Sequence, residues 1–185
     1  MSAAAVLTPP SECDEFYEII DGIRVEMTPM SADAQTIAFD IAFHLNSYAL
    51  RENLGRAYTE VLIKLPLPQM RNRRPDAFYV PYSRWKKNKP VPSTNAWDVL
   101  PDLFVEVVSP FDLAEDTRVK VEEYLEAGAR LVWVVYPRQR LVDVFESAAG
   151  SRTVRIADTL DGGVVLPGFR LPMAELFPPE EPEAT

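Results

Sequence analysis

The chain has 185 residues, of which 47% are hydrophobic and 25% charged, as is typical of one soluble domain. Its formal net charge of −9 argues against a protein that coats nucleic acid without specificity, and no apolar run approaches the ~20 residues needed to cross a membrane. The N-terminus lacks a secretory-signal pattern, and the single cysteine, Cys13, excludes an intramolecular disulfide, so we expect a cytoplasmic protein.

The first predicted element is a β-hairpin. Residues 16–27, FYEIIDGIRVEM, contain two segments in which polar and apolar residues alternate. Asp21-Gly22 separates them, and this dipeptide favours the tight turns that join antiparallel strands. Residues 1–13, before the hairpin, are expected to be disordered.

A long helix is predicted next. Ser31 or Asp33 can cap its start, and apolar residues repeat at helical spacing up to about Arg51. The elements expected after this helix are strands over 57–65 and 75–80, followed by a basic, polar loop over 81–100.

The second half of the chain predicts a crossover between two parallel strands. A strand over 102–108 and a strand over 130–136 flank a helix over about 113–127, and such a connection joins strands that run in the same direction. Residues 140–146 alternate and indicate an antiparallel edge strand. We therefore expect an α/β fold, with a mixed β-sheet flanked by helices. It would form a single domain over 14–177, with a disordered acidic tail over 178–185.

The strand over 102–108 carries one carboxylate within an apolar run. In LFVEVVSP, residues 103–110, Glu106 shares a face with Phe104 and Val108. Burying an unpaired carboxylate costs several kcal/mol, so Glu106 must be neutralised, paired or bound to a cation.

Two further charged residues are expected close to Glu106. Asp76 starts a short strand, and the helix after the Glu106 strand packs back along the sheet, so that Lys120 comes level with Glu106. With the carbonyl of Val107, the two carboxylates would form an oxygen site suited to Mg²⁺. The alternatives are a surface ion pair of Lys120 with Asp116 and a buried ion pair of the acids with Lys120 or an arginine. The residue pattern leaves these alternatives open.

A basic segment surrounds Asp76. Residues 71–89 contain seven basic side chains against this one acid. They form either a solvated loop or a patch that binds a polyanion. The residues that we expect to contact nucleic acid are Arg73, Arg74, Arg84, Lys86 and Lys87.

The ordered set RRPDAFYV, PDLFVEVVSP and VWVVYP resembles the Uma-two (Uma2) family, restriction-endonuclease-like proteins of the PD-(D/E)XK nuclease superfamily. The segments YEIIDGIRVEMTPMS and LPGFRLPMAELF extend the resemblance over roughly residues 16–177. The resemblance implies a restriction-endonuclease-like fold. Asp76 matches the aspartate of the PD motif and Glu106 the acidic member of (D/E)XK. Val108 stands in place of the superfamily lysine, and Lys120 matches a lysine that has migrated to the next helix.

This resemblance implies a metal-dependent endonuclease that hydrolyses phosphodiester bonds in DNA. The catalytic residues would be Asp76, Glu106 and Lys120, and the metal ligands Asp76, Glu106 and Val107. We expect Mg²⁺ as the cofactor, with Mn²⁺ as the other candidate, DNA as the partner, and a homodimer that does not associate with membranes. The alternatives are an inactive nuclease-fold protein that serves as a nucleic-acid-binding or assembly module, and a structural homodimer whose charged residues only pair internally.

Overall fold

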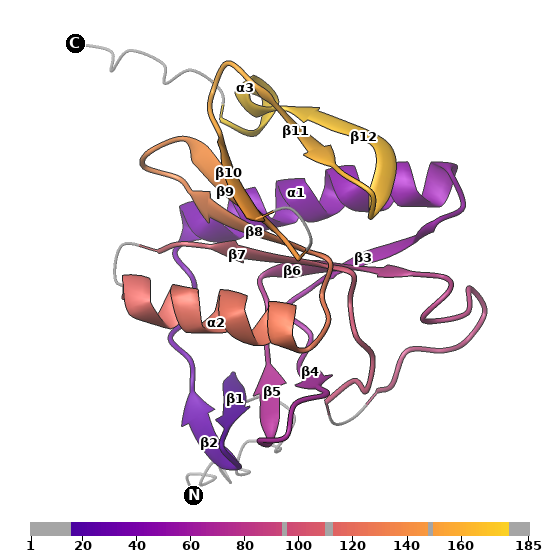
Figure 1. The fold of residues 1–185 in the computed structure, drawn as a ribbon, viewed down its shortest axis with the longest axis vertical. Coiled ribbons are helices and arrows are strands. Elements are labelled where there is room, and N and C mark those ends of the chain that lie inside the picture. The colour runs from indigo at the N-terminus through magenta and orange to yellow at the C-terminus, as the bar shows by residue number, and fades with distance from the viewer. Residues whose placement is uncertain (1–15, 94–95, 110–112, 148–149, 178–185) are drawn as a thin grey trace, which may run out of the picture.

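The centre of the fold is a six-stranded mixed β-sheet (Figure 1). The computed structural model describes residues 16–93, 96–109, 113–147 and 150–177. In the order of the sheet, the strands are β10 (Gly150–Val154), β9 (Leu141–Glu146), β8 (Leu131–Tyr136), β7 (Leu103–Val107), β6 (Ala77–Pro81) and β3 (Gly55–Thr59). The pair β7–β8 is parallel, and the other neighbouring pairs are antiparallel. The predicted mixed sheet and the parallel crossover are confirmed.

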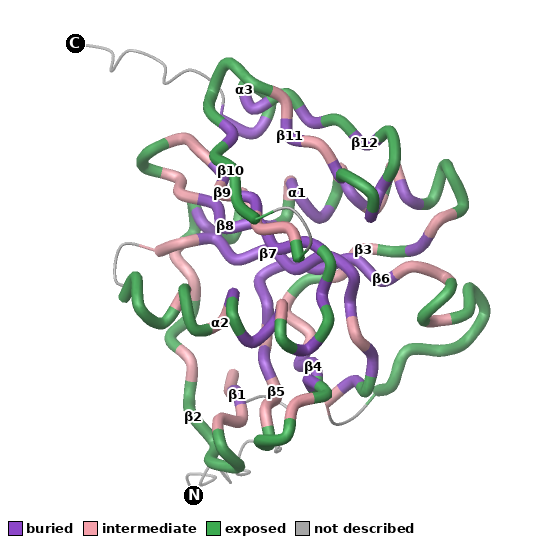
Figure 2. Tube along the Cα trace, viewed as in Figure 1, coloured by how far each residue is buried: buried purple, intermediate pink, exposed green. Residues whose placement is uncertain are grey.

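One helix covers each face of this sheet (Figure 1). Helix α1 (Ala32–Arg51) buries a stripe of residues three or four positions apart, which includes Ile41 and Leu45. Helix α2 (Ala114–Glu126) packs on the opposite face. Because both faces are covered, all five residues of β7 are buried, and Figure 2 shows the same for the middle of the sheet.

The predicted N-terminal hairpin is also confirmed. It consists of β1 (Tyr17–Ile20) and β2 (Ile23–Glu26). Asp21 and Gly22 have φ values of 52° and 77°, and the type I′ turn requires positive φ at both positions. Strand β1 also pairs with β5 (Arg71–Arg73), which pairs with β4 (Ile63–Leu65). The resulting four-stranded sheet, β2-β1-β5-β4, lies on the same side of the central sheet as α2 (Figure 1).

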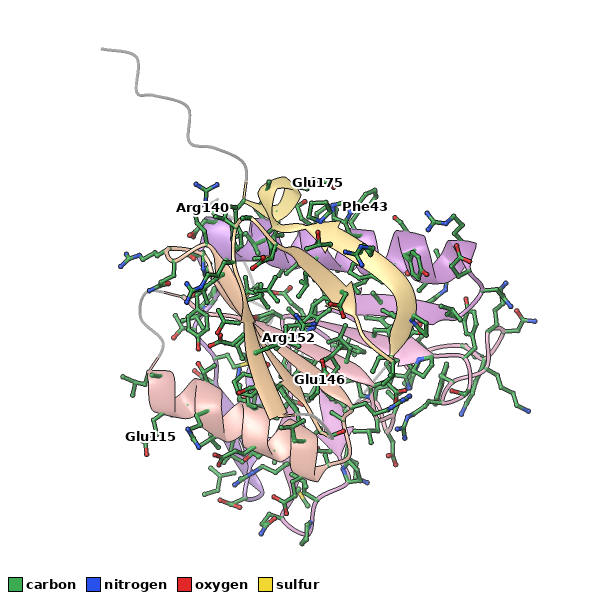
Figure 3. All side chains as sticks on the ribbon, turned by 45° about the horizontal axis from the view of Figure 1, so that its top comes forward. Phe43, Glu115, Arg140, Glu146, Arg152 and Glu175 are labelled. Atoms are coloured by element: carbon green, nitrogen blue, oxygen red, sulfur yellow. The ribbon has the colours of Figure 1, made fainter. Side chains whose placement is uncertain are left out.

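The C-terminal elements pack on the side of α1. Strands β11 (Thr159–Gly162) and β12 (Leu166–Pro172) form a two-stranded sheet, and the short helix α3 (Met173–Leu176) follows. Both β12 and α3 contact α1. Arg152 of β10 and Glu146 of β9 are labelled in Figure 3. Arg152 lies 3.7 Å from Glu146 and 3.0 Å from Asp161 of β11. The pair with Asp161 joins the end of the central sheet to the C-terminal strands.

Two strand predictions were wrong. The segment 57–65 is not one strand, because Glu60 adopts a left-handed conformation with φ 54° and the chain leaves the central sheet there. Its first part is β3 and its last part is β4 of the smaller sheet. The segment 140–146 is antiparallel as expected, but it is not an edge strand, because β10 pairs with its outer side.

Some expectations fall outside the part of the chain that the structure describes. The disorder expected for residues 1–13 and 178–185 concerns such residues. Within the described ranges, no helix is both long and apolar enough to cross a lipid bilayer.

Candidate active site

Asp76 and Glu106 lie side by side at one end of the central sheet. The register of β6 and β7 pairs Ala77 with Val105, which places Asp76 opposite Glu106 one position further along. Both side chains are buried, with Asp76 8% exposed and Glu106 5% exposed. The N–H of Val107 donates a hydrogen bond of 2.6 Å to Asp76 Oδ2, so the backbone of β7 holds this carboxylate in place.

Helix α2 supplies two partners for Glu106. Lys120 Nζ lies 2.8 Å from Glu106 Oε2, and the hydroxyl of Tyr124 donates a hydrogen bond of 2.6 Å to Glu106 Oε1. Lys120 and Tyr124 are four residues apart, so both side chains leave the same face of the helix. The ring of Tyr124 stacks on Phe104, with ring centroids 4.0 Å apart. The carboxylate inside the apolar strand is therefore paired with a cation and hydrogen-bonded at both oxygens.

The environment perturbs both of these helix side chains. Burial opposes the charge of the Lys120 ammonium, but the carboxylates of Glu106 and Glu18 outweigh burial, and the pKa of Lys120 is raised above its ordinary value. Burial, together with the negative charge of Glu106, raises the pKa of Tyr124 well above that of a free phenol. Lys120 thus stays charged and Tyr124 stays a hydrogen-bond donor at neutral pH.

The alternative partner of Lys120, Asp116, is not the one that its ammonium contacts. Besides Glu106, the ammonium of Lys120 has Glu18 of β1 as a neighbour, whose Oε1 lies 3.8 Å from Lys120 Nζ. This arrangement makes Glu106–Lys120 a largely buried pair rather than a pair on an exposed helix face, since the side chain of Lys120 is only 18% exposed.

Glu18 belongs to an ion-pair network that the sequence did not indicate. Its Oε2 lies 2.6 Å from Arg73 of β5, and the Nε of Arg73 lies 2.6 Å from Glu123 of α2. Arg71 contacts the other oxygen of Glu123 at 2.7 Å. The network therefore joins the N-terminal hairpin to α2 beside Lys120. A glutamate in an alternating hairpin resembles any exposed strand residue, so the pattern offered no signal for Glu18.

Two of the residues predicted to contact nucleic acid, Arg73 and Arg74, lie beside the candidate site, but protein groups engage their guanidinium groups. Arg73 is 5% exposed, and Glu18 and Glu123 both engage its guanidinium. Arg74 donates to the backbone carbonyl of Glu60 and lies 4.8 Å from the centre of the Phe16 ring. These two arginines hold the hairpin and the turn before β6.

The other three lie in the loop after β6, at the opposite end of that strand from Asp76. Arg84 contacts Asp102 at 2.6 Å, and its side chain is 37% exposed. Lys86 is exposed, and Lys87 donates to Asn53 at 2.7 Å. Their contact with DNA stays a prediction.

The donor set is suited to a hard cation. Asp76 and Glu106 offer carboxylate oxygens, and Val107 adds a backbone carbonyl, the ligand types with which Mg²⁺ binds proteins through few contacts. Each ionised carboxylate has about four acceptor positions, so the hydrogen bonds already made leave capacity for a cation. Among the described residues, no three His, Cys, Asp or Glu side chains cluster into a metal-binding group. A metal would therefore depend on these two acids, on backbone oxygen and on water.

A cavity opens beside Asp76. Its volume is about 330 Å³. Thr59 and Glu60 line it from the end of β3, and Gln35, Thr36 and Phe39 line it from α1. Asp76 thus borders a cavity shared with α1, whereas the partners of Glu106 come from α2.

Comparisons with known proteins identify the family and the fold of this chain. A family model, Uma2, described as "Putative restriction endonuclease", matches residues 6–174. A solved structure, titled as that of "a putative nuclease belonging to DUF820" from Anabaena variabilis ATCC 29413, is similar to this chain with a TM-score of 0.76 and 18% sequence identity. The alignment covers 92% of this chain and 93% of that chain, so the two share a fold. No curated protein has significant sequence similarity to the chain.

Proposed function

Because this chain belongs to the Uma2 family, we propose that it is a metal-dependent endonuclease that hydrolyses phosphodiester bonds in DNA. The observation that supports this most directly is the pair of buried carboxylates, Asp76 and Glu106, with the ammonium of Lys120 2.8 Å from Glu106. Two acids can hold a metal ion that assists phosphodiester hydrolysis, and a lysine beside them can stabilise the charge that develops on the phosphate.

In this proposal each residue has a distinct task. Asp76, Glu106 and the carbonyl of Val107 hold Mg²⁺, or Mn²⁺ in its place. When bound, such an ion polarises a phosphoryl group and lowers the pKa of a coordinated water. Lys120 stabilises negative charge that develops on the phosphate oxygens. Tyr124 holds Glu106 in a fixed orientation through its hydrogen bond at 2.6 Å.

DNA is the proposed partner, and the loop after β6 is the proposed contact surface. Arg84, Lys86 and Lys87 lie there and would bind phosphates at a distance from the catalytic pair. We leave Arg73 out of this surface because its guanidinium is buried between two carboxylates. A cytoplasmic homodimer completes the proposal, and the single cysteine fits a reducing compartment.

A second candidate function is an inactive nuclease-fold protein that binds nucleic acid or assists assembly. Two observations favour it. Both oxygens of Glu106 already accept hydrogen bonds from protein groups, and the net charge of −9 opposes binding to DNA. A purely structural homodimer, in which these charges only pair internally, is the third alternative.

Cleavage of supercoiled plasmid and of single-stranded DNA in Mg²⁺ or Mn²⁺ separates these functions. We compare the wild type with Lys120→Met and Glu106→Gln, after thermal unfolding has shown that each variant is folded at the assay temperature. Loss of one preorganised charge donor should lower the cleavage rate of Lys120→Met by about two to three orders of magnitude. No metal-dependent cleavage by the wild type would favour the binding module. Equal cleavage by all three proteins would indicate a contaminant and refute the assignment of these residues.

A further inference from the structure

The loop after β6 forms a second cavity, which we call the loop pocket. It has a volume of about 300 Å³ and lies between this loop and the strands β3 and β6. We propose that the loop pocket binds a nucleoside phosphate, either free or as one nucleotide of a single strand. The proposal extends the proposed function, but binding in this pocket requires neither a metal nor cleavage.

The charge of the loop pocket selects an anion. Four basic side chains line it, and no Asp or Glu among the described residues does. Arg56 comes from β3, and Lys86, Lys87 and Lys89 come from the loop. In a chain with a net charge of −9, such a local excess of positive charge attracts a phosphate.

Aromatic rings hold two of these ammonium groups in place. Lys89 Nζ lies 3.5 Å from the centre of the Trp85 ring, and Lys87 Nζ lies 5.6 Å from the centre of the Tyr82 ring. Such contacts stabilise a cation by about 0.5–1 kcal/mol at exposed sites. The lysines are therefore partly preorganised, which reduces the entropy lost when they bind a phosphate.

The wall of the pocket contains a hydrogen-bond donor that lacks a partner. The hydroxyl of Tyr82 is buried, and within the described ranges no group forms a hydrogen bond with it. A buried polar group without a partner is unfavourable, and such groups are rare in native proteins. Because this hydroxyl has almost no accessible surface, a phosphate oxygen or a base carbonyl would accept its hydrogen bond only after the Tyr82 side chain rotates toward the pocket.

Two aromatic rings of the pocket could stack with a planar base on one face each, because Lys89 lies over one face of Trp85 and Phe78 stacks on one face of Tyr58. Tyr58 and Trp85 line the pocket, and both rings pack edge-on against the buried Trp97, with centroids 5.0 and 5.1 Å away. This packing makes the wall rigid. Base–aromatic stacking tolerates any sequence, because every base has a π-face. A cavity of this size accommodates one nucleotide and excludes a duplex.

The loop pocket is connected to the candidate active site by the end strand of the central sheet. Strand β3 is the last strand of that sheet. Its residues Arg56 and Tyr58 line the loop pocket, whereas Thr59, at its end, lines the cavity that contains Asp76. Asp76 and Val80 are four residues apart along β6, or about 13 Å at ~3.3 Å per residue. A strand with B-form spacing of ~3.4 Å would cover this distance in about four nucleotides.

Binding to the full-length chain in EDTA tests the proposal without cleavage. The probes are a fluorescein-labelled oligothymidylate, thymidine 5′-monophosphate, and an abasic oligonucleotide with the same number of phosphates. Tyr82→Phe removes only the hydroxyl and should lower affinity about tenfold, as expected for a lost hydrogen bond to a charged group. Because that hydroxyl has no partner among the residues that the structure describes, Tyr82→Phe should melt at or above the wild-type temperature.

A charge variant provides a second readout. The double substitution Arg56→Ala and Lys89→Ala should reduce the slope of log affinity against log salt by roughly 1.4 for the oligothymidylate, about 0.7 for each lost phosphate contact. Arg155→Ala, in the turn between β10 and β11, is the matched control for the loss of one exposed charge. It should leave affinity and slope unchanged.

The outcomes distinguish the sources of the ligand. If Tyr82→Phe weakens binding of the mononucleotide as well, the pocket takes a free nucleotide; if it weakens only the oligothymidylate, the pocket takes part of a strand. Equal affinity of the wild type and Tyr82→Phe for both probes overturns the proposal. So does equal binding of the abasic oligonucleotide, or of a polyglutamate peptide, because the site would then recognise charge alone. None of these results depends on cleavage of plasmid DNA, which tests the proposed function separately.

Discussion

Replacing Lys120 with methionine tests how strongly the buried charge cluster stabilises the fold. Methionine keeps most of the apolar stem of lysine and removes only the ammonium. In the wild type this ammonium lies 2.8 Å from Glu106 and 3.8 Å from Glu18. Its removal leaves two buried carboxylates with less compensating charge.

The structure sets the expected magnitude. Breaking a fully buried ion pair costs about 3–5 kcal/mol, whereas an exposed pair contributes about 0–1 kcal/mol. The side chain of Lys120 is 18% exposed, and Glu106 retains its hydrogen bond from Tyr124. We therefore expect Lys120→Met to lower the free energy of unfolding by about 2 kcal/mol. This is well above the effect of an exposed pair.

Helix α2 offers a matched control. Arg118 pairs with Glu122 at 2.9 Å, one turn further along the helix, and these side chains are 80% and 62% exposed. Arg118→Met should cost less than about 0.5 kcal/mol. The free energy of unfolding of both variants is measured by urea denaturation in EDTA, with circular dichroism as the signal. If Lys120→Met lowers the free energy of unfolding no more than Arg118→Met does, the argument that burial strengthens the Glu106–Lys120 pair is refuted.

The pH dependence adds a second test. The pKa of Lys120 is raised in the folded state. Its contribution to stability is therefore complete below the unfolded-state lysine pKa of about 10.4, and it is lost as the pH rises through the higher folded-state pKa. The stability difference between wild type and Lys120→Met should stay constant from neutral pH to about 10 and shrink above it. A difference that already shrinks near neutral pH would contradict this assignment.

The remaining predictions concern the metal, the DNA surface, a glycine and the assembly. Calorimetry should detect Mg²⁺ or Mn²⁺ binding that Asp76→Asn or Glu106→Gln abolishes, and the metal should raise the melting temperature of the wild type only; equal binding by all three would end the metal-site proposal. Alanine at all three loop residues proposed to contact DNA should weaken DNA binding and flatten its salt dependence, and an unchanged slope would assign these charges to solubility. Gly55→Ala should lower the free energy of unfolding by about 3 kcal/mol in urea denaturation, because the added Cβ would lie 2.3 Å from the carbonyl oxygen of Val80. A decrease below about 1 kcal/mol would mean that the backbone adjusts to the added methyl group. Light scattering should give twice the chain mass of 20.9 kDa, and a monomer mass at all concentrations would contradict the homodimer.

Local chemistry was enough to predict the main elements. Asp21-Gly22 specified the hairpin turn because both residues tolerate positive φ. The apolar run around Glu106 indicated a strand covered on both faces, and β7 is buried throughout. The spacing from Glu106 to Lys120 placed both charges at one level, since the rises of strand and helix are constants of the backbone. These features depend on residues close together in the sequence.

The strand boundaries depended on contacts that local patterns do not encode. Residues 57–65 alternate as one strand would, yet Glu60 turns the chain out of the central sheet with φ 54°. Strand β10, with the sequence GSRTV, carries little apolar signal and forms because β9 offers it an edge. Pairing with a neighbour stabilises such a strand, and only the folded sheet determines which neighbours are present.

The two acids and the lysine of the candidate site could be predicted from the sequence, because their spacing and the motif that they resemble can be recognised along the chain. The pairing of Arg73 with Glu18 and Glu123 could not be predicted, because it depends on how the chain folds. These partners lie 55 and 50 residues away and belong to different elements. Whether an arginine binds a phosphate or a buried carboxylate depends on which groups surround it after folding, since desolvation makes a buried charge retain the partners that packing provides.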